Sequence, residues 1–150
     1  MGRHSLAAAI SGLLLALALA LPVQASGTAI SMLTCNGNGQ QWDVNPLSNV
    51  TFKFTWATVT KAQAVNLKNH SNVRFTVRGT AIASPNSYWG APVDQGSYWG
   101  VSWRYPFGPL GVGNSARTTM QVTLTAPVFD GVGTVPAGPY FDPILKCKIY

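Results

Sequence analysis

Strict alternation of apolar and polar side chains is the feature that most constrains the fold of this chain. Four segments carry the alternation, at residues 50–56, 73–78, 118–125 and 144–150. Every second side chain in them is apolar, which is the period of a β-strand with one buried face. Residues typical of turns separate the segments. The pattern predicts an all-β fold, an antiparallel β-sandwich of about seven short strands.

Other segments are less regular. Short strands are predicted at residues 28–34 and 41–44. The motif Ser-Tyr-Trp-Gly occurs at 87–90 and again at 97–100, which predicts two strands joined by a turn. Residues 60–68 favour a helical turn, although no clear capping residue is seen. Residues 107–115 are rich in Gly and Pro and are predicted to form a loop.

The first 25 residues have the pattern of a secretory signal. Arg3 precedes an Ala/Leu-rich run, and small residues before the bond after Ala25 suit cleavage there. A membrane anchor is the alternative, but the apolar run is short and lacks a basic flank. We therefore expect export to the periplasm and then to the cell surface, or secretion. The mature chain would be one domain, residues 26–150, without a membrane span.

Charge is scarce and mostly positive. Only 9% of the residues are charged, against about 25% in ordinary globular domains. Ten basic and four acidic residues give a net charge of +6, and loss of Arg3 with the signal leaves +5. The basic residues are scattered, and export removes the usual nucleic-acid ligand, so nucleic-acid binding is not expected.

The two cysteines, Cys35 and Cys147, lie near the two ends of the mature chain. An even number of cysteines in an oxidising compartment predicts a disulfide. Closing so long a loop would stabilise the fold by about 4–5 kcal/mol. A zinc site is the weaker alternative, because His70 is the only other soft ligand in the mature chain.

The C-terminal fifth of the chain resembles chaperone–usher pilus subunits and the related spore-coat-U-type secreted pilins. The shared features are a strand ending at Pro127, a Gly-rich connection over 131–137, the step Gly138-Pro139-Tyr140-Phe141-Asp142, and a last alternating strand ending at Tyr150. The resemblance implies an immunoglobulin-like sandwich that lacks its final strand. Such a fold is completed first by a periplasmic chaperone and then by a neighbouring subunit, at an outer-membrane usher.

The same resemblance assigns roles by position. The strand that contacts chaperone and subunit would contain Leu145, Cys147, Ile149 and Tyr150, and residues 26–34 would be the donated segment. Three features depart from the family pattern: the late position of Cys147, the short segment before Cys35, and the lysines on either side of Cys147. These departures leave a second hypothesis open, a self-contained secreted carbohydrate-binding β-sandwich module.

No catalytic constellation is seen, so we expect a non-enzymatic protein without cofactor or metal. His70 lies in a polar turn sequence without a nucleophile elbow nearby. The acidic residues Asp43, Asp94, Asp130 and Asp142 stand beside turn residues or Asn, where Asp usually bonds its own backbone. A paired-carboxylate glycosidase site would need two of them in one cleft. The glycosylation sequon at Asn49 runs into a strand predicted to be buried.

Aromatic residues are dense between positions 88 and 105. By alternation with Val101, Trp99 and Trp103 are predicted to belong to the core. Tyr88, Trp89 and Tyr98 are the candidate ligand face, because Tyr and Trp offer large rigid contact areas to a surface glycan or a protein. The primary hypothesis is thus a structural or adhesive fimbrial subunit joined by strand complementation. The alternative is glycan binding through this aromatic stretch.

Overall fold

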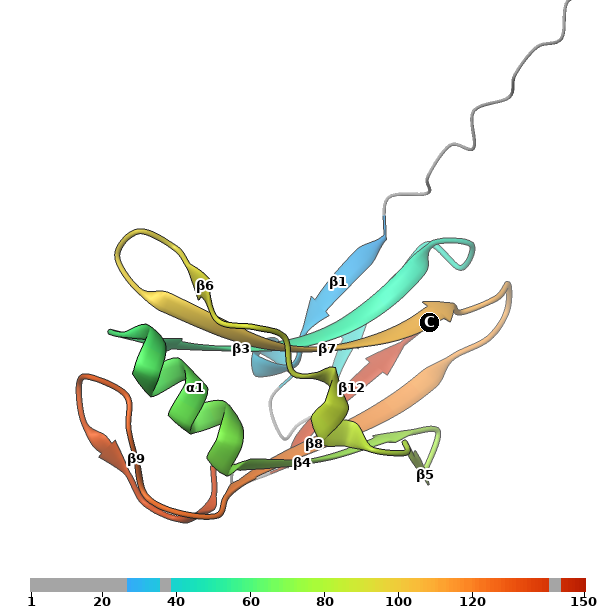
Figure 1. Ribbon diagram of the computed structural model, residues 1–150. Coiled ribbons are helices and arrows are strands. Elements are labelled where there is room, and N and C mark those ends of the chain that lie inside the picture. The colour runs from blue at the N-terminus through green and yellow to red at the C-terminus, as the bar shows by residue number, and fades with distance from the viewer. Residues whose placement is uncertain (1–26, 36–38, 141–143) are drawn as a thin grey trace, which may run out of the picture.

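Two β-sheets face each other across an apolar core in the computed structural model, which describes residues 27–35, 39–140 and 144–150 (Figure 1). The predicted signal 1–25 with its cleavage site lies outside the described residues. So do residues 36–38 of a predicted turn and residues 141–143 of the Gly-x-Tyr-x-Asp step. The prediction of an all-β sandwich is confirmed.

The first sheet, called sheet 1, has four strands. In spatial order they are β1 (Thr28–Ser31), β3 (Asn49–Thr58), β7 (Trp99–Pro109) and β6 (Val93–Asp94). β3 and β7 are antiparallel along almost their whole lengths. The apolar face of β3 is buried, as its alternation predicts, and consists of Val50, Phe52, Phe54 and Trp56.

The second sheet, called sheet 2, has six strands. The main order is β2 (Gln40–Trp42), β12 (Leu145–Ile149), β8 (Ala116–Leu124), β4 (Ser71–Val77) and β5 (Thr80–Ala81), while β11 (Gly138–Pro139) pairs with β8. A separate two-stranded hairpin is formed by β9 (Val128–Phe129) and β10 (Thr134–Val135). The inward residues of β4, β8 and β12 pack against those of sheet 1.

Two strand pairs are parallel, so the prediction of a purely antiparallel sandwich is wrong at these places. β1 pairs in parallel with β3, and β2 pairs in parallel with β12. Between β1 and β2 the chain passes through a 3-10 turn, Met32–Thr34, and leaves the edge of sheet 1 for the edge of sheet 2. Alternation reports which face of a strand is buried, not the direction of its neighbour, so the sequence pattern could not show these pairings.

The predicted disulfide between Cys35 and Cys147 is confirmed. The two Cα atoms are 5.1 Å apart, and both residues are buried. Met32 packs against the bridge, with its Sδ 3.8 Å from Cys147 Sγ. The bridge therefore joins the crossing segment between β1 and β2 to the last strand, where the two sheets meet.

Strand β12 has a partner from its own chain on each side. It is antiparallel to β8 over Leu145–Ile149, and its last three residues pair with β2. Leu145, Cys147 and Ile149 point into the core, and the Tyr150 side chain is exposed. The Tyr150 main chain extends the pairing, because its N–H donates to the Trp42 carbonyl and its carbonyl accepts from Val44. Over residues 147–150 the last strand is thus an interior strand of sheet 2.

The helical segment is longer than predicted. Helix α1 (Lys61–His70) connects β3 to β4 and lies where the two sheets separate at one end (Figure 1). The expectation that no capping residue precedes the helix is wrong. The Thr60 hydroxyl accepts from the Gln63 N–H, and the Gln63 side chain accepts from the Thr60 N–H. This is a reciprocal capping box with Gln in the third helical position.

Replacing Thr60 by Ala is expected to lower the free energy of unfolding by about 1 kcal/mol, because one amide of the first helical turn loses its acceptor. Thr60→Ser keeps a hydroxyl and is the matched control, expected to cost less. Urea denaturation followed by circular dichroism measures both. Equal losses in the two variants would contradict a stabilising role of the hydroxyl.

Two further expectations are corrected by the structure. The first Ser-Tyr-Trp-Gly copy does not begin a strand, since Pro85–Tyr88 is a 3-10 turn and Trp89 makes only an isolated bridge with Trp103. The predicted loop at 107–115 begins later, because β7 continues to Pro109. The reason is packing: the ring of Phe107 lies against Phe52, with centroids 6.0 Å apart.

Candidate functional site

The tryptophans of the aromatic stretch serve mainly the core. Trp103 is fully buried, and its Nε1 donates to the Pro85 carbonyl at 2.7 Å. Trp99, also predicted to be core, is only partly buried, and Lys61 Nζ lies 5.6 Å from its ring centroid. The prediction that both side chains belong to the core is therefore confirmed for Trp103, while Trp99 lies at the edge of the core.

The candidate ligand face does not form one surface. Trp89 is only 6% exposed, and its ring centroid lies 5.8 Å from that of Phe54. Tyr88 is half-buried and packs edge-on against Tyr105. Tyr98 alone is exposed, at 41%. The repeated motif predicts two strands, but the first copy lies in and just after a 3-10 turn while the second leads into β7.

Tyr98 borders a groove of about 420 Å³ on the outer face of sheet 1. The groove runs over β3 and β7 and is bounded by β6 and by the segment before it. Its lining residues are Lys53, Thr55, Gly90, Ala91, Val93, Gln95, Tyr98, Gly100, Ser102 and Arg104. This volume is within the range of small-molecule and ligand sites.

The turn between β6 and β7 holds Tyr98 over the groove. The Asp94 carboxylate accepts from the Gly96 N–H at 2.8 Å, and the Gln95 N–H donates to the Tyr98 carbonyl at 2.9 Å. Gly96 has φ of +84°, which favours glycine at this position. The Tyr98 ring lies beside the backbone of Gly100, which has no side chain; a Cβ added at Gly100 would be 3.6 Å from Tyr98 Cε2.

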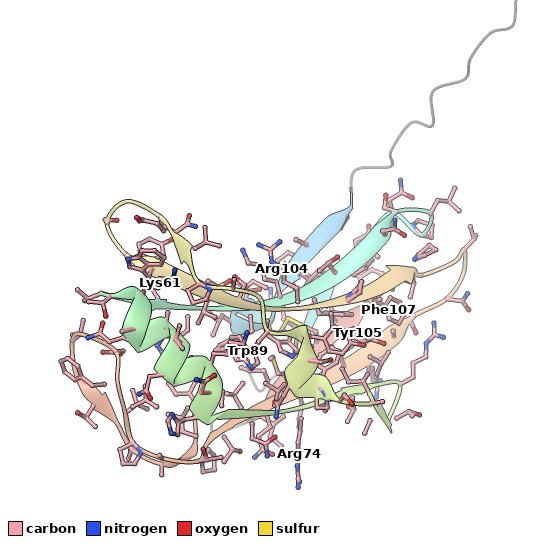
Figure 2. All side chains as sticks on the ribbon, in the orientation of Figure 1. Lys61, Arg74, Trp89, Arg104, Tyr105 and Phe107 are labelled. Atoms are coloured by element: carbon pink, nitrogen blue, oxygen red, sulfur yellow. A yellow bond between two sulfur atoms is a disulfide. The ribbon has the colours of Figure 1, made fainter. Side chains whose placement is uncertain are left out.

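The floor of the groove is polar. Thr55 and Ser102 face each other across β3 and β7, and their hydroxyl oxygens are 2.9 Å apart. The next outward pair is Lys53 opposite Arg104. Figure 2 shows Arg104 directed away from the core, on the side opposite Trp89. The groove thus combines an aromatic edge, a hydroxyl pair and two cations.

A second groove, of about 330 Å³, lies on the outer face of sheet 2. It is also basic, with Arg117, Lys146 and Lys148 among its lining residues. Lys148 lies opposite Arg117 on β8, and its Nζ is 5.8 Å from the ring centroid of Tyr150. No aromatic side chain is among the described residues that line this groove, which distinguishes it from the groove bordered by Tyr98.

Three titratable groups outside the grooves, His70, Asp130 and Tyr140, have local structural environments that account for them. His70 Nδ1 lies 2.9 Å from the Asn66 carbonyl oxygen within α1. The Gly133 and Val132 amides donate to the Asp130 carboxylate and lower its pKa, while burial raises the pKa of Tyr140. In the described ranges, no three His, Cys, Asp or Glu side chains lie close enough together to hold a metal ion.

The fold and groove define a cross-linked β-sandwich with a polar, aromatic-edged groove on one outer face. No protein-family model matches the sequence, and no curated protein or solved structure is significantly similar to it. Across residues 27–35, 39–140 and 144–150, no helix has the length and apolar character needed to span a membrane.

Lys53 and Arg104 were not singled out from the sequence. Each occupies an outward position of an alternating segment, which is the only local signal they carry. Their juxtaposition depends on the register of two strands that are about fifty residues apart in the sequence, a distance that local patterns do not bridge.

Proposed function

We propose that this chain is a non-enzymatic, exported glycan-binding β-sandwich module, with the groove bordered by Tyr98 as its binding site. The observation that carries the proposal is the position of Tyr98, exposed over the bare backbone of Gly100 beside the hydroxyls of Thr55 and Ser102. An aromatic ring offers its face to the C–H groups of a sugar, and nearby hydroxyls and amides suit the sugar hydroxyls.

The pairing of the last strand favours a module that is complete within one chain. β12 has partners on both sides over Cys147–Ile149, and residues Thr28–Ser31, part of the expected donor segment, pair with β3 of the same chain. The disulfide cross-links the same region. A disulfide is also compatible with export, because disulfides persist in oxidising compartments.

A glycan array with the oxidised domain tests the proposal. Tyr98→Ala is expected to weaken binding at least about tenfold, which corresponds to roughly 1.4 kcal/mol. The reason is loss of the aromatic ring that borders the groove, the single one among the described residues that line it. Affinities for the best array ligand are then measured by isothermal titration calorimetry. Trp89 is left unchanged, because truncating a core residue would confuse binding with folding.

Tyr150→Ala is the matched control for Tyr98→Ala. The Tyr150 side chain is similarly exposed, at 48%, but belongs to sheet 2. We expect its removal to leave glycan affinity within about twofold of the original. Absence of any glycan binding, or equal affinity of the Tyr98→Ala variant and the unchanged domain, would refute the proposed function.

A fimbrial subunit assembled by strand addition is the second candidate. The C-terminal resemblance motivates it, and the outer edges of β1 and β2 carry no further strand in the described part of the chain. An open edge is what strand addition requires. Sedimentation of the purified domain with a synthetic peptide of residues 26–34 tests this candidate: a stable complex would favour it over the glycan-binding module.

A further inference from the structure

The groove bordered by Tyr98 contains two like charges placed directly opposite each other. Lys53 on β3 is the register partner of Arg104 on β7, and both side chains line the groove. Like charges in directly opposed positions destabilise a sheet. The pair therefore lowers stability unless a group of opposite charge lies between the two cations.

No such group is present among the described residues. Asp94 and Asp130 accept hydrogen bonds from backbone amides of their own turns. Asp43 lies just beyond β2, a strand of sheet 2, and none of the three lines the groove. Within residues 27–35, 39–140 and 144–150, the side chains of Lys53 and Arg104 make no hydrogen bond or ion pair, and only their backbones are paired in the sheet.

We propose that the groove selects acidic polysaccharides, with a uronate carboxylate bound between Lys53 and Arg104 while another sugar ring of the same chain lies against Tyr98. The inference rests on the proposed glycan-binding function and adds the chemical class of the ligand. The guanidinium group of Arg104 can donate two parallel hydrogen bonds to a carboxylate, and the ammonium group of Lys53 supplies a third donor.

The geometry along β7 fits an oligosaccharide. Gly100, Ser102 and Arg104 alternate outward along one strand, and Gly100 to Arg104 spans about 13 Å at the usual rise of a β-strand. That distance exceeds one sugar ring. The Tyr98 ring beside Gly100 and the cations near Arg104 would therefore contact different units of the same ligand, with the Thr55–Ser102 hydroxyl pair between them.

The basic face of sheet 2 is the competing site for an anionic ligand. Lys148 also lies opposite a cation, Arg117, but its Nζ lies over the ring of Tyr150. Since the described residues that line this groove include no aromatic ring, we expect it to attract polyanions weakly and without preference for the sugar. Its lysines supply a variant of equal charge for comparison.

The test uses the folded, oxidised domain and two probes with the same sugar chain: trigalacturonate, which is negatively charged, and its fully methyl-esterified form, which is neutral. By isothermal titration calorimetry in low salt, the acid is expected to bind at least tenfold tighter than the ester. We expect Lys53→Gln/Arg104→Gln to abolish that preference, and Lys146→Gln/Lys148→Gln, with the same change in net charge, to retain it. Raising the salt concentration is expected to lower the affinity for the acid more than the affinity for the ester.

Each outcome separates the two proposals. Equal binding of acid and ester would overturn the acidic preference while leaving glycan binding intact. Loss of trigalacturonate binding in Lys146→Gln/Lys148→Gln would overturn the assignment of the site to the groove bordered by Tyr98. Binding to vesicles of anionic phospholipid as tight as binding to trigalacturonate would overturn it as well. Failure to bind either probe or any array glycan would refute the proposed function itself. An unchanged or raised Tm of Lys53→Gln/Arg104→Gln shows that the fold is intact, as removal of a like-charge pair predicts.

Discussion

Breaking the Cys35–Cys147 bridge is expected to lower the free energy of unfolding by about 4–5 kcal/mol, and Tm by about 10–20 °C. The two cysteines are 112 positions apart, so the bridge removes much of the freedom of the unfolded chain. It also fixes the segment between β1 and β2 to the last strand. For a domain whose total stability is on the order of 5–15 kcal/mol, this is a large share.

The cleanest comparison is the oxidised domain against the same domain after reduction, both followed by urea denaturation. Reduction removes the cross-link but keeps both sulfur atoms, including the one that lies 3.8 Å from Met32 Sδ. Cys35→Ala/Cys147→Ala serves as the second variant, which cannot re-form the bridge. A loss below about 1 kcal/mol in both would contradict the stabilising role assigned to the bridge.

Trp103→Ala is expected to cost about 3–5 kcal/mol of unfolding free energy. Trp103 is fully buried, and its ring packs against Phe75 with centroids 4.9 Å apart. The substitution leaves a cavity between the two sheets and removes the donor to the Pro85 carbonyl. Chemical denaturation, with near-ultraviolet circular dichroism as a second probe, measures the loss.

Two variants separate the contributions at Trp103. Trp103→Phe keeps a ring but loses the Nε1 donor, and is expected to cost about 1–3 kcal/mol, because the Pro85 carbonyl loses its partner. Trp99→Ala removes the same side chain at a partly buried position and should cost less than Trp103→Ala. Equal losses at positions 99 and 103 would contradict the assignment of Trp103 to the centre of the core.

Local alternation was enough to predict the strands that build the core. The segments that contain β3, β4, β8 and β12 all bury the face that their apolar residues define. The end-to-end disulfide followed from the count and position of the cysteines. The buried face of each strand follows from its neighbouring residues, and the disulfide follows from the cysteine content of the chain.

The remaining features depend on contacts between distant segments. Parallel pairing of β1 and β2 requires knowledge of how the chain crosses between sheets. The groove requires the register of β3 against β7, which places Lys53 beside Arg104. Trp89 and Trp99 have identical neighbours in sequence, yet only Trp89 is buried in the core. The cap at Thr60 does not depend on distant contacts. Thr60 and Gln63 stand three residues apart, which is the spacing of a capping box and a signal present in the local sequence.

Hydrogen exchange of the monomeric, oxidised domain tests most directly whether the sandwich is complete within one chain. The amides of β12 bonded within sheet 2, together with that of Tyr150, are the reporters. Without any partner they are expected to be protected nearly to the level of global unfolding, as buried core strands are. Rapid exchange that slows only when a peptide of residues 26–34 is added would contradict this account and would indicate a fold that needs a donated strand.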